Sequence, residues 1–328
     1  MTQPKNAPIF SKLDCFFHVA KEKVPQHGED SDCYSICEDG LILGVFDGCG
    51  GAGAKQYPAY RSKTGAYIGA RAVAGTVQAW FENGAITDRL EDNAEAIKAY
   101  IGRGLSVCKA HSGQQAETKL RGSIVKEFPT TAAIAHCVCR PAAVSLDCFW
   151  AGDSRVYLLN DDGLAQLTQD DLDGLDAYEN LSNDGVLTNL ISAGKPFELH
   201  AARFICQRPF IVFAATDGCF GYIPSPMEFE LLLLQCLLKE KSAADFETSL
   251  SGHLEKVAAD DFTLVGAAFG YGSFAGLQSS LFPRYRALLQ MNISGLKDAP
   301  PEQRETVWNQ YRANYYRLIP EGKKSGQA

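Results

Sequence analysis

The segments LILGVFDG, at residues 41–48, and FIVFAATDG, at residues 210–218, decide the fold, because each runs an apolar strand directly into an Asp-Gly pair. A third segment, DDFTLVGAAF at residues 260–269, places its two acids before the apolar strand. This reversed order is expected if the third strand runs antiparallel to the others. The three strands can therefore bring acidic side chains to one edge of the fold.

These acids favour a metal site. An Asp-Gly pair taken alone is typical of a turn, because Asp bonds nearby backbone and Gly accepts a positive φ. Carboxylates gathered at the end of an apolar core, however, repel one another unless a cation neutralises them. Asp47, Asp217 and Asp260 offer only oxygen ligands, which suit Mg²⁺ or Mn²⁺. The six histidines have no spacing typical of a zinc site.

The composition is that of an ordinary globular protein, with 46% hydrophobic and 21% charged residues among 328. A formal net charge of −8, without a stripe of Lys and Arg, excludes a general nucleic-acid binder. No stretch approaches the ~18 uninterrupted apolar residues of a membrane span, and the eleven cysteines include no CxxC pair. We expect a cytoplasmic monomer in a reducing setting, with no membrane partner.

The order of elements predicts an α+β fold. Strand patterns occur at residues 14–20, 32–38, 41–46, 129–140, 143–152, 155–161, 163–168, 204–215 and 262–269. Helical patterns occur at residues 57–81, 90–109, 227–239 and 243–258. The first three strands predict a meander, with EDG at 38–40 as the turn between the second and third. Strands and paired helices in this order favour a central antiparallel β-sandwich flanked by helix pairs, in an α-β-β-α arrangement.

Three segments lie outside this pattern. Residues 1–11 are a polar leader. Residues 160–195 are predicted to form an acidic flap, because eight acids and no Lys or Arg occur between 160 and 184. We expect the flap to be exposed, either as a solvated loop or as a surface that selects substrate or binds a further metal.

The C-terminal extension, residues 271–328, carries eight Lys and Arg against four Asp and Glu. Trp308, Tyr311, Tyr315 and Leu318 recur at helical spacing after Pro300-Pro301, and an earlier helix is predicted at about 283–291. We expect the extension to dock on the domain formed by residues 12–270. A regulatory or partner-binding role is the alternative.

The run GCGGAG at residues 48–53 satisfies the GxGxxG pattern of dinucleotide-binding folds. The ribose-binding acid expected ~20 residues further on is missing, because no Asp or Glu occurs between residues 54 and 81. A glycine loop that lets the backbone approach a charged site explains this run better.

Six motifs occur in order along the chain: GEDS at 28–31, VFDGCGG at 45–51, PTTA at 129–132, AGDSR at 151–155, ATDG at 215–218 and DDFT at 260–263. From about residue 12 to residue 270, this set resembles the metal-dependent Ser/Thr protein phosphatases of type 2C. The resemblance implies a β-sandwich flanked by helices, with two bridged Mn²⁺ or Mg²⁺ ions at one edge. It also implies a phosphorylated protein as substrate and a cognate Ser/Thr kinase as a partner.

By motif position, the resemblance implies that Asp47 bridges both metals, that the Gly48 carbonyl binds one of them, and that Asp217 and Asp260 hold the other. Two cations ~3.5–4 Å apart lower the pKa of a shared water and clamp the phosphoryl oxygens for in-line attack. No phospho-enzyme is needed, which agrees with the lack of a GxSxG nucleophile elbow.

Further acids are implied by the same motifs. Glu29 and Asp30 would bind metal or order metal-bound waters. Asp153 matches a residue that helps to bind a third metal in bacterial relatives. Asp261 is a neighbour and not a ligand.

The sequence departs from the family pattern at two positions. Cys49 replaces a histidine that can protonate the leaving alkoxide, so Cys49 either is a poor proton donor or only fills space. No arginine precedes the GEDS acids, and Lys23 or His27 would have to contact phosphate without a bidentate fork. Two functions stay open: an active phosphatase, or a catalytically weak or inactive module that binds phosphoproteins or a kinase.

Overall fold

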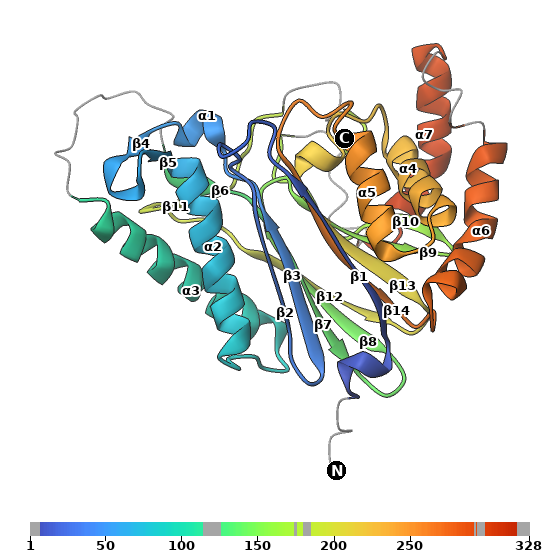
Figure 1. The fold of residues 1–328 in the computed structure, drawn as a ribbon, viewed down its shortest axis with the longest axis horizontal. Coiled ribbons are helices and arrows are strands. Elements are labelled where there is room, and N and C mark those ends of the chain that lie inside the picture. Colours follow the sequence, from blue (N-terminus) through green and yellow to red (C-terminus); the bar gives the residue numbers. More distant parts are fainter. Residues whose placement is uncertain are drawn as a thin grey trace.

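A computed structural model describes residues 7–113, 126–173, 176–179, 185–291, 293 and 299–319. Within these residues, two five-stranded antiparallel sheets pack face to face, and helices cover their outer faces (Figure 1). The predicted α+β class and the α-β-β-α sandwich are confirmed. No helix of the described part of the chain is long and apolar enough to cross a membrane.

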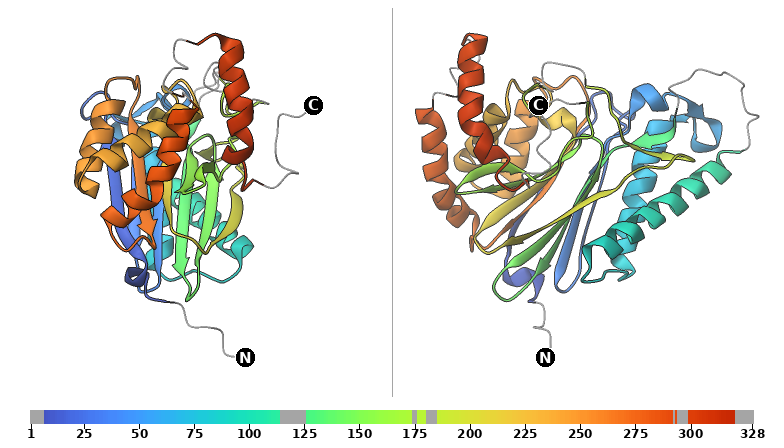
Figure 2. Two further views of the ribbon diagram at one scale, coloured as in Figure 1. Left: turned by 90° about the vertical axis from the view of Figure 1, so that its right-hand side faces the viewer. Right: turned by 180° about the vertical axis from the view of Figure 1, so that it is seen from behind.

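The first sheet pairs, in order, β1 (Leu13–Lys21), β14 (Phe262–Phe269), β13 (Phe210–Ala215), β9 (Arg155–Asn160) and β10 (Gly163–Gln166). The second pairs β12 (His200–Cys206), β8 (Val144–Ala151), β7 (Ala132–Cys139), β3 (Gly40–Phe46) and β2 (Ser31–Ile36). The second sheet is covered by α2 (Gly65–Glu82) and α3 (Leu90–His111), and the first by α4 (Pro226–Lys239), α5 (Ala243–Leu254), α6 (Phe274–Gln290) and α7 (Pro301–Tyr315) (Figure 2). Smaller elements are α1 (Gly50–Gly53), β4 (Gln56–Tyr57), β5 (Lys63–Thr64), β6 (Glu127–Thr130) and β11 (Ile191–Ala193).

The strands that carry the Asp-Gly pairs are buried on both faces. Every residue of β3, β13 and β14 is buried, because each strand has the opposite sheet on one side and helices on the other. This explains their continuous apolar runs, which replace the usual alternation. β14 pairs antiparallel with β13, as the reversed order of acids and strand predicts.

The predicted opening meander is wrong for its first strand. β2 and β3 do form a hairpin, closed where Cys37 N donates to Gly40 O at 2.9 Å. β1, in contrast, pairs with β14 in the other sheet. The pairing joins segments about 250 residues apart, which local patterns do not encode.

Two helix boundaries also differ from the prediction. α2 begins at Gly65, because residues 56–57 and 63–64 pair as a short ribbon whose turn contains Arg61 and Ser62 at φ 55° and 59°. α6 spans Phe274–Gln290 and contains Pro283, where the sequence predicted a start at this proline.

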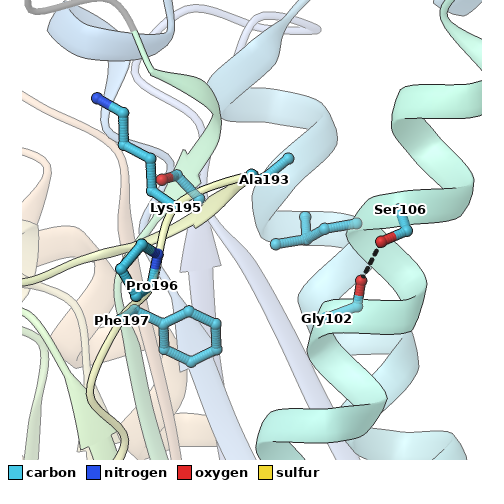
Figure 3. Close-up of a pocket in the computed structure, with 9 residues that line it drawn as sticks. Gly102, Ser106, Ala193, Lys195, Pro196 and Phe197 are labelled. Carbon is cyan, nitrogen blue, oxygen red and sulfur yellow. Dashed lines mark hydrogen bonds between the residues drawn. The ribbon is translucent and has the colours of Figure 1, made fainter.

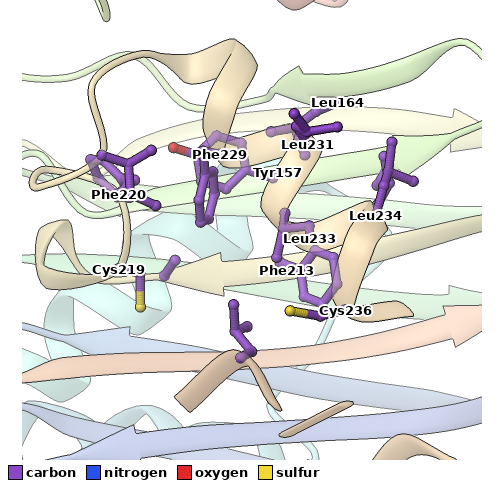
Figure 4. Close-up of a cluster of buried hydrophobic side chains, with 14 of the residues drawn as sticks. Tyr157, Leu164, Phe213, Cys219, Phe220, Phe229, Leu231, Leu233, Leu234 and Cys236 are labelled. Atoms are coloured by element: carbon purple, nitrogen blue, oxygen red, sulfur yellow. The ribbon is translucent and has the colours of Figure 1, made fainter. Parts of the chain in front are cut away.

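Three apolar layers hold the domain together. One lies between the sheets, one between the second sheet and α2 and α3, and one between the first sheet and α4 to α7. In the third layer, Phe213 and Tyr157 of the sheet pack with Phe229 and Leu233 of α4 (Figure 4). Burial of apolar side chains at roughly 25 cal/mol per Å² makes these layers the main source of stability.

The C-terminal extension forms part of the third layer. Trp308, Tyr311 and Tyr315 are at most 2% exposed and join the apolar cluster on the first sheet. Leu318 lies beyond the end of α7, so it does not belong to the predicted helix. Residues 292, 294–298 and 320–328 of the extension lie outside the described residues.

The expectation that the acidic flap is exposed is wrong in part. Within the acidic flap, β10 is fully buried and Asp176 is 6% exposed. Residues 174–175 and 180–184 of the flap lie outside the described residues. In the leader, Ile9 is fully buried, and residues 1–6 lie outside the described part of the chain.

Candidate metal centre

The acids of the three motifs lie next to the ends of strands from both sheets, and these strand ends lie on the same side of the sandwich. Asp47 follows β3, Asp217 lies two residues after β13, and Asp260 lies two residues before β14. Asp30 precedes β2, and Asp153 lies in the turn between β8 and β9. Repulsion from the other four acids raises the pKa of Asp47, in addition to the larger effect of burial, so these four carboxylates lie close enough to Asp47 to act on its charge.

Glycines at this edge allow close approach of backbone to backbone. A Cβ on Gly218 would lie 1.8 Å from Asp261 O. A Cβ on Gly48 would lie 2.7 Å from Ala66 O and 2.8 Å from Glu29 O. The glycine of each Asp-Gly pair is therefore required by packing against another element, and neither glycine takes a positive φ.

We expect Gly218→Ala to destabilise the fold by about 3 kcal/mol, because the methyl group would displace the Asp261 backbone. Gly75→Ala in α2 is the matched control, since no atom lies within 4 Å of its would-be Cβ; it should stabilise by about 0.5–1 kcal/mol. Urea unfolding measures both changes. Equal effects at the two positions would contradict the packing argument.

Threonines hold the backbone and side chains of these acids. Thr130 Oγ1 donates to Asp47 O at 2.7 Å, and Asp47 N donates to Thr131 Oγ1 at 3.2 Å. Thr216 Oγ1 donates to Asp30 Oδ2 at 2.8 Å. Sequence reasoning assigned no role to these threonines, although their place inside the PTTA and ATDG motifs was the available signal.

Asp261 anchors the loop that carries Glu29 and Asp30. Its Oδ1 accepts a hydrogen bond from Lys23 N at 2.7 Å and its Oδ2 accepts one from Glu29 N at 2.6 Å. Lys23 Nζ donates to Ala258 O at 2.6 Å, so its ammonium is directed to a backbone carbonyl. The other proposed phosphate contact, His27, lies exposed on the same loop.

A cation near this loop comes from α2. Burial raises the pKa of Glu29, whereas the hydroxyl of Thr64 and the charge of Arg71 lower it. The guanidinium of Arg71 lies 3.5 Å from the centre of the Tyr67 ring. Arg71 lies far from the GEDS motif in sequence, so only the fold could reveal it.

Burial perturbs the acids strongly. It raises the pKa of Asp30 and Asp153 to about 8 and that of Asp217 to about 6. Asp153 Oδ1 is buried and has no hydrogen-bond partner among the described residues. Such a set of oxygen donors fits hard divalent cations such as Mg²⁺ and Mn²⁺.

The acidic side chains of this site do not converge on one point as the ligands of a bound ion do. Within the described ranges, no three Asp, Glu, His or Cys side chains are grouped closely enough to hold an ion. Cys49 lies next to the acids, with its Sγ 3.9 Å from Asp47 O. Burial, together with repulsion from Asp47, Asp153 and Asp217, raises the pKa of its thiol well above the usual range.

The metal-free protein should become more stable as the pH falls from about 8 to about 5. Acids whose pKa is about 8 or 6 in the folded state and ~3.9 in the unfolded state take up protons on folding in this window. Each such proton contributes ~1.4 kcal/mol per pH unit. Thermal unfolding in EDTA at several pH values measures the slope, which should be shallower in Asp30→Asn. A stability that rises toward pH 8 would contradict the assignment of these shifts.

A separate pocket of about 300 Å³ lies between α3 and the segment that follows β11 (Figure 3). Its lining includes Ser106, Lys195 and Phe197 and contains no carboxylate. This pocket therefore does not belong to the acid cluster.

Comparisons with known proteins bear on the family and the fold of this chain. The sequence profile described as Protein phosphatase 2C matches residues 22–257, a range that contains four of the five acids and ends just before Asp260. A search of curated protein sequences found no significant match.

Solved structures show the same fold. The Ser/Thr phosphatase Stp1 from Staphylococcus aureus is 15% identical with a TM-score of 0.60, and the match covers 82% of this chain and 99% of Stp1. PstP/Ppp from Mycobacterium tuberculosis is 17% identical with a TM-score of 0.54, covering 78% of this chain and 98% of that one. The PstP catalytic domain in complex with two manganese ions is 16% identical with a TM-score of 0.53, covering 79% and 100%. With its profile match over more than half of its length, this chain belongs to the protein phosphatase 2C family.

Proposed function

We propose that this chain is a Mn²⁺- or Mg²⁺-dependent protein phosphatase that hydrolyses phosphoserine and phosphothreonine without a phospho-enzyme. The observation that carries the proposal is the set of acids at the strand ends on one side of the sandwich. Burial and mutual repulsion raise the pKa values of these acids. Without a cation, the charges of this cluster destabilise the fold. A bound cation would neutralise them, which explains why so many acids occur together. We assign residues 12–270 as the catalytic domain and residues 271–328 as its extension.

The residues that would hold the ions are Asp47, the Gly48 carbonyl, Asp217 and Asp260, with Glu29, Asp30 and Asp153 as further ligands or holders of bound water. Two such ions supply an activated water and neutralise the phosphoryl oxygens. The chain itself fixes the positions of Asp47 and Asp30 through the threonines of the PTTA and ATDG motifs. Arg71, beside Glu29, is the cation placed to attract the phosphate of a phosphoprotein substrate.

Hydrolysis of an aryl phosphate and of a phosphothreonine peptide tests the proposal, each measured with Mn²⁺, with Mg²⁺ and with EDTA. We expect metal-dependent turnover of both substrates. A protein that binds the phosphopeptide but hydrolyses neither substrate would instead be a phosphatase-fold binding module, which is the alternative suggested by Cys49.

Cys49→His should raise the rate on phosphopeptides at least about tenfold, since a positioned general acid typically contributes 10²–10⁴-fold. The rate on an aryl phosphate should change little, because an aryloxide leaves without protonation. Steady-state kinetics on both substrates at pH 7 measures the ratio. Cys49→Ala is the control, and a similar gain in that variant would show that the thiol only obstructs the site.

A further inference from the structure

Helix α7 contacts the acidic segment, defined here as residues 170–173 and 176–179. Trp308 Nε1 donates to Asp176 Oδ2 at 3.0 Å, and Ala177 N donates to the Tyr316 hydroxyl at 2.8 Å. Arg312 Nε lies 3.5 Å from Asp176 Oδ2. The Asp176–Trp308 bond is buried, so these contacts join the C-terminal extension to the acidic segment from within the fold.

The other end of the acidic segment is bonded to the turn that carries Asp153. Asp171 N donates to Gly152 O at 3.0 Å, and Gly152 N donates to Asp171 Oδ2 at 2.8 Å. Arg155 Nε and Nη2 form a bidentate pair with the Asp170 carboxylate. The described parts of the acidic segment therefore contact the α7 region at residues 176–177 and the 152–155 turn at residues 170–171.

A second route joins α7 to the same turn. The fully buried Tyr315 packs on Tyr157 at 6.4 Å between ring centroids. Arg155 Nη1 donates to the Tyr157 hydroxyl at 3.2 Å. Arg155 is thus held by one residue of the acidic segment and by one residue that α7 covers.

The extension lies outside the matched profile. The phosphatase profile ends at residue 257, before α6 and α7. Stp1 is matched over 99% of its own length by 82% of this chain. Part of this chain therefore has no counterpart in Stp1.

We propose that α7 is a positioning element of the candidate metal centre. Trp308 and Tyr316 hold the acidic segment against the 152–155 turn, and this contact sets the place of the Asp153 carboxylate. The expected effect on catalysis rests on the proposed function. The coupling of α7 to the 152–155 turn does not, because it is a property of the metal-free fold.

The double variant Trp308→Phe/Tyr316→Phe tests the proposal, because it removes both hydrogen bonds to residues 176 and 177 and keeps an aromatic side chain at each position. Tyr311→Phe is the matched control, since it removes the hydrogen bond from α7 to Glu230 on α4. Hydrogen exchange of the Gly152 and Asp171 amides, without metal, reports the coupling. Titration with MnCl₂, followed by calorimetry, reports the metal centre.

We expect faster exchange at Gly152 and Asp171 in the double variant and not in the control. Mn²⁺ affinity should fall about tenfold, as for loss of residues that orient metal ligands, and kcat should fall with KM nearly unchanged. Unchanged exchange in a folded double variant, or an equal change in Tyr311→Phe, would overturn the proposal. If the wild type binds no Mn²⁺, the proposed function fails while the exchange data still decide the coupling. Trp308→Phe alone serves if the double variant does not fold.

Discussion

Asp217→Asn is expected to reduce Mn²⁺-dependent phosphate hydrolysis by roughly 10³-fold. Loss of one ligand weakens a metal that contributes several kcal/mol to the transition state, and each ~1.4 kcal/mol corresponds to a factor of ten. Initial rates on an aryl phosphate across a Mn²⁺ titration measure the effect. Asp92→Asn on α3 is the control, because among the described residues that carboxylate makes only a surface ion pair with Arg89.

The same substitution should stabilise the metal-free protein. The pKa of Asp217 is raised to about 6 by burial and by Asp260, so its ionised form is disfavoured in the fold at neutral pH. Asn removes this charge, and we expect a gain of about 1–3 kcal/mol at pH 8 in EDTA. Lost activity together with gained stability separates a metal ligand from a structural residue. Full activity in Asp217→Asn would exclude this carboxylate from the metal centre.

The second large effect is expected at Arg155, whose guanidinium is 3% exposed and forms a bidentate pair with Asp170, itself 6% exposed. The guanidinium also lies 4.1 Å from the centre of the Phe220 ring. Arg155→Met should cost about 3–5 kcal/mol, because it removes the buried guanidinium that compensates the charge of the Asp170 carboxylate. Urea unfolding at pH 7 measures the loss.

Two further variants give this prediction its controls. Arg208→Met removes an exposed pair with Asp161 and Asp162 and should cost at most about 1 kcal/mol. Arg155→Met/Asp170→Leu should recover part of the loss, because no uncompensated charge remains. If the double variant were less stable than Arg155→Met, the buried pair would not be the cause.

The sequence predicts the sandwich because its signals are local. An apolar run that ends in Asp-Gly determines a buried strand with an acid at its end, and the reversed run at 260–269 determines an antiparallel partner. The hairpin of β2 and β3 follows from the adjacent EDG turn. The motif order was sufficient to identify the family, since it depends on residue types and spacing alone.

Local sequence signals do not predict contacts between distant segments of the chain. The acidic stretch is rich in charge and predicts an exposed loop, but Asp176 is buried because α7 brings Trp308 to it from 132 residues away. Asp261 was set aside as a neighbour, and the fold makes it the anchor of the Glu29 loop. In both cases the partner comes from a remote segment, so the energy of burying the acid cannot be judged before the partner is known.

The sequence by itself thus determined the strands, the turns and the acids at the strand ends, because backbone preference and apolar pattern act within a few residues. Only the tertiary structure decided that β1 pairs with β14, that the charge of Arg71 acts on Glu29, and that α7 completes the core. The physical reason is that these contacts depend on which buried surfaces and charges meet across the chain, and that is settled by packing the whole domain at once.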